Sequence, residues 1–508
     1  MTAVTRPPAP ATTVPAARSH TTWAAVFALA RFEARRLLLR LPVLVAFAVY
    51  TGWTLWRTPS SWNGYPALQD ADRATQSGTL LIGLAVLLCA NQAVLRSRRH
   101  DTERHFAVCV LAPWRRTVAH LLSVVPAALL TAVCVGGQFT WEALKPGAVG
   151  HGSPGELLVG PLAVLLFGAA GVLLARVVPG ALAAPLLIVL ALSFSVLGTG
   201  FGGDGRTRWL APVVSENSTA TLPSDLLGRP AAWHALYLTG LALSLALVAV
   251  LLSGGLRLRT VRTGLAGAVA LTLVGAVAQS GEVPAETSAA RTRASVSPEK
   301  VQECTERDGT TYCVYPEWGP RVRHWDPVVD RVRSLAGATA ADRPLLVRQR
   351  VEARYGLSGD AAIRPLTRPG EVTVGTAWGG NRVPEFSVAV AGVLVAGRES
   401  EVGALCDGRM VTVMWLGLAG RPDPIGDLRS VRLDDSASGA AVVVSQTEPL
   451  SMTGAHTELV RELLERPRDA VAAKVRANWA ELTTPKVTTG RVAELLGLPA
   501  PTESDECL

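Results

Sequence analysis

Residues 157–175, LLVGPLAVLLFGAAGVLLA, and residues 177–199, VVPGALAAPLLIVLALSFSVLGT, are two long apolar runs separated only by Arg176. A helix needs about 20 apolar residues to cross the hydrocarbon core of a bilayer. Both runs approach or exceed that length, and the Pro179-Gly180 pair at the start of the second run predicts a turn. This stretch therefore predicts a tight transmembrane hairpin in a multi-pass α-helical membrane protein.

Further runs of the same kind surround this hairpin along the first half of the chain. They occupy residues 41–56, 79–95, 117–139, 235–254 and 263–279. A helix satisfies its own peptide groups in hydrocarbon, whereas irregular backbone exposed to lipid does not. We therefore predict a six-helix membrane domain over residues 41–260 and a seventh transmembrane helix over residues 261–280.

The rest of the chain has a different composition. The 508 residues are 49% hydrophobic and 18% charged overall, but beyond residue 280 the charges are spread as in a water-soluble domain. We predict a disordered Pro/Ala-rich cytoplasmic tail at 1–21 and an amphipathic interfacial helix at 22–40. A linker at 281–299 is expected to lead to a mixed α/β extracytoplasmic domain at 300–508.

The positions of the arginines predict the orientation in the membrane. With the N-terminus in the cytoplasm, the inside segments hold sixteen arginines, and the outside loops hold six arginines or lysines. Cytoplasmic loops carry the excess of Lys and Arg in membrane proteins. We therefore predict a plasma-membrane protein whose N-terminus is cytoplasmic and whose C-terminal domain, after seven crossings, lies outside the cell. These anchors explain the net charge of +8 without a nucleic-acid partner.

A cysteine pair supports the external position of the C-terminal domain. Cys304 and Cys313 flank the dipeptide Asp308-Gly309, which is a strong signal for a two-residue β-hairpin turn. Counting outward from the turn places the two cysteines directly opposite each other, at a separation that a disulfide accepts. We predict a cross-strand disulfide in an oxidising compartment; half of a zinc site is the rival interpretation. The sequence leaves open whether Cys406 pairs with Cys507.

Local patterns predict the elements of this domain. Apolar residues at helical spacing predict helices at residues 326–335, 456–482 with a break at Pro467, and 488–498. Short apolar runs predict strands at residues 371–374, 386–395, 410–415 and 440–444.

No motif for catalysis occurs in the sequence. None of the four lysines follows a glycine, so there is no Walker A loop, and there is no His-Glu-x-x-His, Gly-x-Ser-x-Gly or Cys-x-x-Cys motif. The Asp434-Asp435 pair is interpreted as part of a solvated loop. The apolar runs contain no Asp, Glu, Lys or internal Arg, which ion-coupled transporters normally keep at mid-membrane. We therefore expect neither an enzyme nor an independently powered transporter, and no cofactor on this chain.

The largest cytoplasmic excursion is predicted at residues 96–116, RSRRHDTERHFAVCVLAPWRR. Together with the amphipathic segment ALARFEARRLLLR ahead of six core spans, this loop resembles that of the type-2 ABC exporter permeases, in their actinobacterial branch. In that family the loop carries a small residue, Thr and a nearby Glu, then a Ser-Pro-x-x-Arg pattern, and it forms the coupling helix that meets the ATPase. The positions that the resemblance assigns to this role are Thr102, Glu103, Pro113, Arg115 and Arg116.

The sequence departs from the family pattern in places. Asp101 and Ala112 stand where the family commonly has Gly and Ser, and the seventh span and the external domain are additions to the six-span pattern. The resemblance implies an exporter permease that pairs with a second copy or a paralogue and is powered by a separate cytosolic ABC ATPase, which holds the ATP and magnesium.

Two hypotheses from other classes remain open. One is a membrane-anchored extracytoplasmic binding or sensor protein without transport activity, in which the spans serve as an anchor. The other is a cell-surface enzyme without a recognised motif. The sequence does not indicate the transported substrate.

Overall fold

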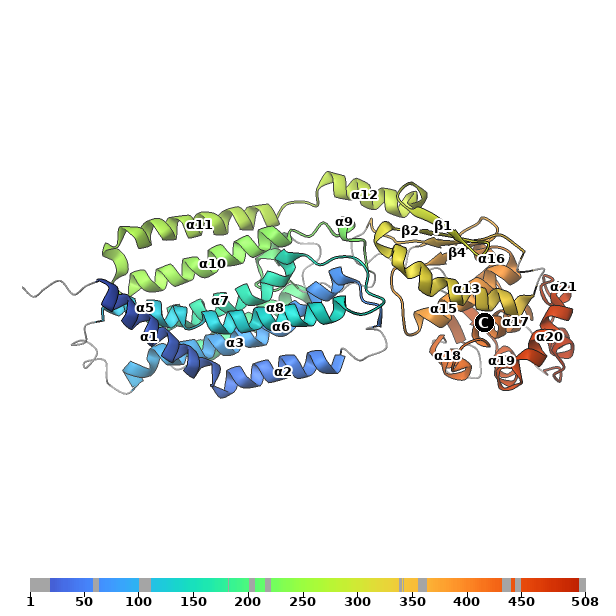
Figure 1. Ribbon diagram of the computed structural model, residues 1–508, viewed down its shortest axis with the longest axis horizontal. Coiled ribbons are helices and arrows are strands. Elements are labelled where there is room, and N and C mark those ends of the chain that lie inside the picture. Colours follow the sequence, from blue (N-terminus) through green and yellow to red (C-terminus); the bar gives the residue numbers. More distant parts are fainter. Residues whose placement is uncertain are drawn as a thin grey trace, which may run out of the picture.

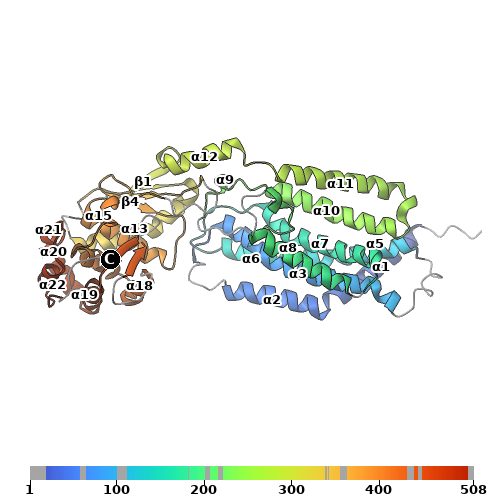
Figure 2. The same cartoon turned by 180° about the vertical axis from the view of Figure 1, so that it is seen from behind.

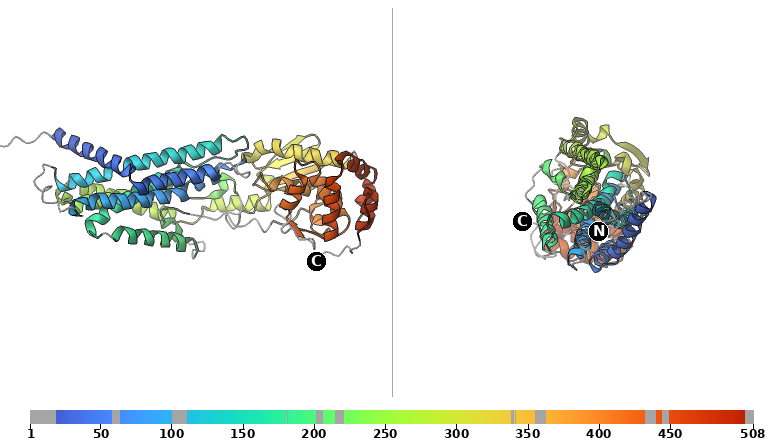
Figure 3. Two further views of the ribbon diagram at one scale, coloured as in Figure 1. Left: turned by 90° about the horizontal axis from the view of Figure 1, so that it is seen from below. Right: turned by 90° about the vertical axis from the view of Figure 1, so that its left-hand side faces the viewer.

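The computed structural model is elongated, with a helical bundle at one end and a mixed α/β domain at the other (Figure 1). It describes residues 19–57, 64–99, 111–180, 182–200, 206–214, 221–337, 340, 342–354, 363–431, 440–443 and 449–501. Views from behind and from below show the same two-part arrangement (Figures 2 and 3).

Helices that run roughly along the long axis form most of the bundle. Their bounds are α1 Ser19–Leu38, α2 Leu41–Arg57, α3 Leu68–Arg99, α5 Pro113–Leu122, α6 Val125–Ala143, α7 Pro154–Val177, α8 Ala183–Gly200, α10 Ala231–Leu252 and α11 Arg259–Gln279. The short helix α9, Ser224–Leu227, lies at the end nearest the soluble domain. Helix α7 is central, because it packs against α3, α6 and α10.

Five helical segments are long and apolar enough to cross a membrane. They are Leu68–Ser97, Pro113–Ala143, Pro154–Val177, Ala231–Leu252 and Arg259–Gln279. A sixth candidate is the pair α1 and α2, which is bent by 60° at its break. The segment predicted as an interfacial helix is thus helical, and the segment predicted as the seventh span passes the length and apolarity test.

Seven spans are not confirmed, because the second arm of the predicted hairpin is short. Helix α8 begins only at Ala183, since the Pro179-Gly180 turn takes up the first residues of the apolar run. Its described apolar portion, Ala183–Ser193, falls in the class of shorter apolar helices. The bundle is therefore that of a membrane protein with five to six candidate spans in the part of the chain that the structure describes.

Small residues bring the last two spans together. A Cβ atom at Gly275 of α11 would lie only 2.6 Å from the backbone nitrogen of Tyr237 in α10, so only glycine fits at this crossing. Close approach through small residues is typical of helix pairs in membranes. The outward faces of α8 and α11 carry exposed apolar side chains such as Leu186, Val189 and Leu273, which suits contact with lipid.

A four-stranded mixed sheet forms the edge of the soluble domain. The strands are β1 Glu303–Arg307, β2 Thr310–Val314, β3 Leu345–Gln349 and β4 Glu371–Val374, in the order β1-β2-β3-β4. β1 and β2 are an antiparallel hairpin, whereas β2, β3 and β4 are parallel. Helix α13, Val322–Ala336, lies between β2 and β3 in the chain, as a parallel pair requires a crossover.

The predicted hairpin and its disulfide are confirmed. Asp308 and Gly309 have φ angles of 43° and 72°, the positive values that a type I′ turn needs. Cys304 pairs with Cys313 in the register, and the two are disulfide-bonded with a Cα–Cα distance of 4.1 Å. Cys406 is also disulfide-bonded, while Cys507, its candidate partner, lies outside the described residues.

Two predicted strands are wrong. Residues 386–395 belong to helix α15, Arg382–Ala396, and residues 410–415 belong to helix α17, Arg409–Leu418. Both helices are buried on almost every side, so they lack the polar face that would reveal a helical period. Tertiary burial overrides the strand preference of their valines.

The other local predictions agree with the structure. Further helices of the soluble domain are α16 Glu399–Val402, α18 Pro424–Val431, α19 Gly454–Glu465, α20 Arg468–Ala477, α21 Trp479–Leu482 and α22 Thr489–Leu496. The second sheet pairs β5 Ala440–Val443 with β6 Pro449–Met452. Pro467 divides the long predicted helix, and strand β4 has the predicted bounds.

The segment predicted as a linker contains helix α12, Ala285–Val296, and helps to fix the soluble domain to the bundle. The Arg291 guanidinium donates hydrogen bonds to the carbonyls of Leu226 and Leu227, both at 2.7 Å. An apolar cluster continues the contact between the two parts. Its buried members are Ala67, Val149, Leu222, Leu226, Ala294, Tyr315, Trp318, Val351 and Ala353.

Candidate ligand cavity and candidate coupling surface

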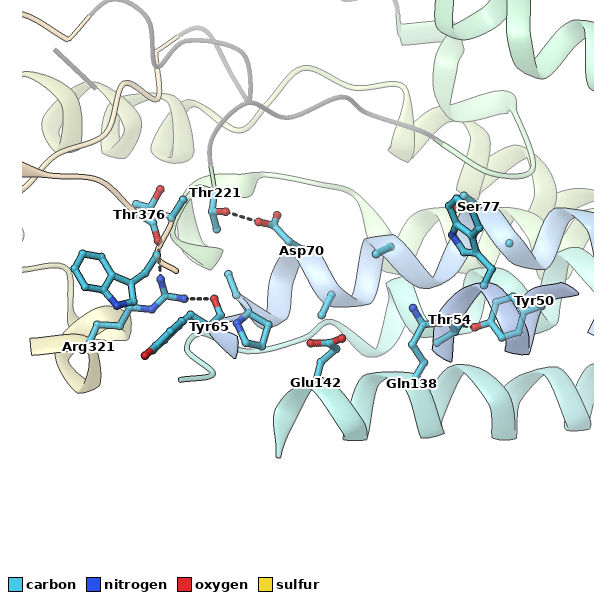
Figure 4. Close-up of a pocket in the computed structure, with 18 of the residues that line it drawn as sticks. Tyr50, Thr54, Tyr65, Asp70, Ser77, Gln138, Glu142, Thr221, Arg321 and Thr376 are labelled. Carbon is cyan, nitrogen blue, oxygen red and sulfur yellow. Dashed lines mark hydrogen bonds between the residues drawn. The ribbon is translucent and has the colours of Figure 1, made fainter. Parts of the chain in front are cut away.

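A cavity of about 600 Å³ lies where the soluble domain meets the bundle. Its size is within the range of about 300–1,000 Å³ that is usual for ligand pockets. Helices α2, α3 and α6 form its walls on the bundle side, and residues before α13 and after β4 close it on the domain side (Figure 4). The lining residues are Val49, Tyr50, Trp53, Thr54, Tyr65, Pro66, Ala67, Asp70, Ala71, Ala74, Ser77, Gly78, Leu81, Gln138, Glu142, Thr221, Arg321, Thr376, Ala377 and Trp378.

The bundle side of the cavity is mostly apolar. At the end of the cavity away from Arg321 (Figure 4), the Tyr50 hydroxyl donates a 2.5 Å hydrogen bond to the Gln138 Oε1 atom. Gly78 leaves room for the Tyr50 ring, because a Cβ at Gly78 would lie 2.5 Å from that ring. Trp53 and Leu81 are exposed apolar side chains on the same wall. An apolar group of a ligand would fit here.

The two carboxylates of the cavity already have cationic partners. Asp70 forms an ion pair with Arg73 one turn along α3 and accepts a hydrogen bond from the Thr221 hydroxyl. The Glu142 carboxylate lies 2.7 Å from the Lys145 ammonium. The negative charges of the lining are thus compensated locally.

Arg321 is the cation on the domain side of the cavity, and it is 1% exposed. Its Nη1 donates to the Thr376 carbonyl at 3.1 Å and its Nη2 to the Tyr65 carbonyl at 2.6 Å, so it joins the domain to the residues before α3 (Figure 4). No carboxylate forms an ion pair with Arg321 within the described part of the chain. Burial lowers the pKa of Arg321 to about 10, so the guanidinium is still charged at neutral pH.

Further contacts join the soluble domain to the bundle at this junction. The Ser224 amide donates to both carboxylate oxygens of Glu317, at 3.2 and 3.0 Å. The Tyr65 ring meets His324 edge-on, with ring centroids 4.9 Å apart. The Arg323 guanidinium donates to the carbonyl of Pro146 in the loop between α6 and α7. The soluble domain is therefore seated on the bundle and is more than a tethered module.

A buried ion pair lies at the same end of the bundle. The Glu156 carboxylate at the start of α7 lies 2.7 Å from Arg229 Nε, and both side chains are less than 8% exposed. Gln76 of α3 donates to the same carboxylate. The guanidinium carbon of Arg229 also lies 4.8 Å from the centre of the Trp209 ring.

This ion pair qualifies the prediction that the spans carry no charge. The apolar runs are uncharged, but the helices extend beyond them, because α3 begins at Leu68 and α7 at Pro154. The additional turns contain the charged residues Asp70, Asp72, Arg73 and Glu156. Hydrophobicity marks the bilayer depth, whereas the helix ends are set by packing and capping.

Helix α5, which holds the predicted coupling residues Pro113, Arg115 and Arg116, lies at the opposite end of the bundle from the soluble domain (Figure 1). Pro113 is the first residue of α5, and Arg115 and Arg116 follow in its first turn. Proline is favoured there because its missing N–H has no partner in a first turn. Thr102 and Glu103 lie outside the described residues.

Both stems of residues 96–116 are fixed to other helices. Before the loop, Arg96 at the end of α3 forms a two-bond ion pair with Glu33 of α1, at 3.3 and 2.9 Å. After the loop, the Thr117 hydroxyl of α5 donates to Ser253 at the end of α10, at 2.7 Å. A displacement of this loop would therefore act on α1, α3, α5 and α10 together.

Aromatic contacts join the first turn of α5 to helix α1. Trp114 of α5 packs edge-on against Trp23 of α1, with ring centroids 6.2 Å apart. The Arg115 guanidinium carbon lies 5.0 Å from the centre of the Trp114 ring, within the range of a cation–π contact. The first turn of α5 and the predicted interfacial helix thus form one continuous surface.

Three carboxylates in the soluble domain come within 4.8 Å of one another at the hairpin turn and α13: Asp308, Asp326 and Asp330. Asp326 accepts a 2.8 Å hydrogen bond from Tyr312. Burial, and then the charges of Asp326 and Asp308, raise the pKa of Asp330. Acidic groups at exposed turns are often this close without an ion, so we assign no metal site to them.

Sequence reasoning missed the cavity and Arg321. Arg321 and Tyr65 are separated by 256 positions, and no local pattern connects them. The sequence around Arg321 is rich in aromatic residues, and Trp318 and Trp325 are both fully buried. Such a pattern predicts a hydrophobic core, but it does not predict a contact between the soluble domain and the bundle.

We find no protein-family model, no curated protein and no solved structure that matches this chain.

Proposed function

We propose that this chain is the membrane-spanning permease subunit of an ABC-type exporter, powered by a separate cytosolic ATPase that docks on residues 96–116. The observation that carries the proposal is the anchoring of both stems of this loop, through Arg96 to Glu33 and through Thr117 to Ser253. ATPase movement at the loop would be transmitted to four helices of the bundle. The cofactors ATP and magnesium would be held by the ATPase.

The distribution of charge supports an external energy source. In the five long candidate spans the charged residues lie within two turns of an end, as Glu156 does at one end of α7 and Arg176 at the other. In the bent pair Trp23–Leu38 and Leu41–Trp56 the charges lie in the first helix and at the break. A transporter that couples to protons or ions normally carries ionisable groups near mid-membrane. The membrane body would therefore depend on a partner for its energy.

We call the end of the bundle that carries both stems of residues 96–116 the loop end, and the end beneath the soluble domain the domain end. The orientation that we propose places the loop end in the cytoplasm and the soluble domain outside the cell. Exposed arginines concentrate at the loop end, in agreement with the positive-inside rule. The Cys304–Cys313 disulfide is compatible with an extracellular domain. The exposed apolar faces of α8 and α11 would meet lipid and, in a dimer, a second copy or a paralogue.

Affinity purification from native membranes tests the proposal. The full chain should retain a nucleotide-binding subunit, and the double variant Glu103→Ala/Arg116→Ala should lose it. Arg257→Ala is the matched control, because Arg257 is an exposed arginine at the same end of the bundle but outside the loop. Failure to recover an ATPase with the unaltered chain, or equal loss in the control, would contradict the proposal.

The second candidate function is a membrane-anchored extracytoplasmic binding or sensor protein. The observation that favours it is the seating of the soluble domain on the bundle through Arg321 and Tyr65, which an exporter does not require. Ligand binding by the full chain with no ATPase partner in the same membranes would select this function. Turnover of the bound ligand would instead indicate a cell-surface enzyme.

A further inference from the structure

We propose that the cavity between the bundle and the soluble domain binds an amphiphile with an anionic head group, which lies beside Arg321 while the apolar tail lies along α2 and α3. This inference concerns a different site from the ATPase-docking loop. It holds whether the chain is a permease or a sensor.

Charge compensation within the cavity lining indicates an anion. Asp70 is paired with Arg73, and Glu142 is paired with Lys145. Among the described residues, Arg321 donates hydrogen bonds only to the carbonyls of Tyr65 and Thr376, although it is 1% exposed. A buried charge without a counter-ion is costly, and an ionised partner offsets that cost. The charge of Asp70, which is itself paired with Arg73, also favours the charged form of Arg321. Among the described residues of the lining, the charged group without an ion-pair partner is therefore a cation.

Unsatisfied polar atoms are found at the same place. Arg321 Nε and Thr376 Oγ1 are both buried and, within the part of the chain that the structure describes, neither has a hydrogen-bond partner. Other buried atoms of the described chain also lack a partner, but these two belong to residues that line the same cavity and are joined by a hydrogen bond. Buried polar atoms of folded proteins are mostly paired, so a ligand that pairs with both is a physical explanation for them. The oxygens of a carboxylate or phosphate would accept from the guanidinium and from the hydroxyl together.

The opposite side of the cavity suits an apolar tail. Tyr50, Trp53 and Leu81 come from α2 and α3, and the small side chain of Ala74 lines the cavity with them. Trp53 lies near the C-terminal end of α2, where tryptophan favours the headgroup zone of a membrane. In Figure 4 the Tyr50 and Gln138 side chains lie at one end of the cavity and Arg321 at the other. The cavity thus has one apolar end and one cationic end.

Other ligand classes fit less well. A cationic amphiphile would have to displace Arg73 from Asp70 or Lys145 from Glu142, and it would leave the charge of Arg321 without a counter-ion. A small free anion would satisfy Arg321 but would leave the apolar wall in contact with water. The amphiphile satisfies both ends.

Photo-crosslinking of the full chain in phosphatidylcholine nanodiscs tests this inference. The probe is a diazirine-bearing 16-carbon fatty acid, and the competitors are palmitate, phosphatidylglycerol, dodecyltrimethylammonium and inorganic phosphate. Palmitate or phosphatidylglycerol should reduce labelling of cavity residues at least tenfold. If only phosphatidylglycerol competes, the head group is that of a membrane lipid; if only palmitate competes, it is a single-chain carboxylate.

Variants test the cationic end and the apolar end of the cavity separately. Arg321→Gln should weaken labelling about tenfold and Arg321→Lys by less, while Ala74→Phe should abolish labelling by filling the tail region and leaving Arg321 in place. Arg333→Gln is the matched control, because Arg333 is another buried arginine of the same domain, 8% exposed and bonded to Thr310. Val133→Phe, on an exposed face of α6 away from the cavity, controls for Ala74→Phe.

The inference is overturned if dodecyltrimethylammonium or phosphate alone competes as well as the more effective of palmitate and phosphatidylglycerol, or if Ala74→Phe labels normally. It is also overturned if the two controls lose labelling to the same extent. The presence or loss of an ATPase in purification does not alter these outcomes, so the two proposals fail separately.

Discussion

The two ends of the helical bundle use arginine in opposite ways. At the loop end, arginine side chains on α1 and around the start of α11 are exposed: Arg31, Arg35, Arg36, Arg257, Arg259 and Arg262. At the end beneath the soluble domain, Arg229 and Arg321 are buried and bonded to groups far away in the sequence. An exposed arginine can meet lipid phosphates or a partner, whereas a buried one fixes the structure. The loop end is built to meet another surface, and the domain end to hold its own parts together.

The largest expected effect follows from breaking the buried pair at the domain end. Glu156→Ala should lower the free energy of unfolding by about 3–5 kcal/mol, because it leaves the charge of Arg229 buried without its carboxylate. Denaturation of the detergent-purified protein, followed by circular dichroism, measures this loss. In Glu156→Leu/Arg229→Met, which removes both charges, most of the stability should return.

The exposed pair Glu462–Arg466 provides the control. Its side chains are 45% and 33% exposed, so Glu462→Ala should cost between about 0 and 1 kcal/mol. If Glu156→Ala cost no more than Glu462→Ala, the domain end would not depend on its buried charges, and the contrast between the two ends would fail.

The disulfide gives the next largest effect, and it is confined to the domain end. Cys304→Ala/Cys313→Ala should lower the stability of the soluble domain by about 2–3 kcal/mol, because the reduced chain regains the freedom of a short loop. Proteolysis of the folded protein would detect the loss as faster cleavage in the soluble domain. The bundle should be cleaved at an unchanged rate, since its described cysteines, Cys89 and Cys134, are free. Faster cleavage of both parts would show that the hairpin also supports the bundle.

The ion pair at the loop end should matter less. Glu33→Ala breaks a pair in which Glu33 is 7% exposed but Arg96 is 26% exposed. The freed guanidinium can reach water, so we expect a loss of about 1–2 kcal/mol, as for a hydrogen bond to a charged group. The same denaturation measurement applies, with Arg31→Ala as an exposed-residue control that should be nearly neutral. A loss as large as that of Glu156→Ala would mean that the loop end is as tightly built as the domain end.

The sequence predicted best what is determined locally. The Asp308-Gly309 turn fixes the register of its hairpin, so the pairing of Cys304 with Cys313 could be counted out from the turn. The break at Pro467 and the bounds of β4 are likewise set by a few adjacent residues. The apolar runs of the bundle were recognisable because membrane helices must be uniformly apolar.

What the sequence did not predict depends on distant contacts. Helices α15 and α17 looked like strands, because complete burial removed the polar face that marks a helix. The cavity required Tyr65, Arg321 and Thr376 to meet across the junction, and nothing local connects them. The seating of α12 by Arg291 was missed for the same reason.

The smallest expected effect is a pH dependence of the junction itself. Burial lowers the pKa of His324, and the neighbouring charges of Arg323 and Arg321 lower it further. In the folded chain the neutral ring accepts a 3.1 Å hydrogen bond at Nε2 from Arg323 Nε, and a protonated ring could not accept it.

The sign follows from the lowered pKa. The unfolded chain takes up its proton first as the pH falls, near the ordinary value of about 6.5. The contribution of His324 is therefore complete above pH 6.5 and is lost as the pH falls through its lower folded pKa. Solvent screening keeps the effect below about 1 kcal/mol.

Hydrogen exchange around Tyr65 and Pro146 can detect this weakening, because Tyr65 packs on His324 and Pro146 accepts from Arg323. Exchange there should be faster at pH 5.5 than at pH 7.5 after correction for the intrinsic rate, and His324→Gln should remove most of the difference. Amides near Thr117 and Ser253, at the other end of the bundle, should show no such difference. An equal pH response at both ends would show that acid weakens the whole structure. The protonation of His324 beside Arg323 and Arg321 would then not be the cause of the weakening.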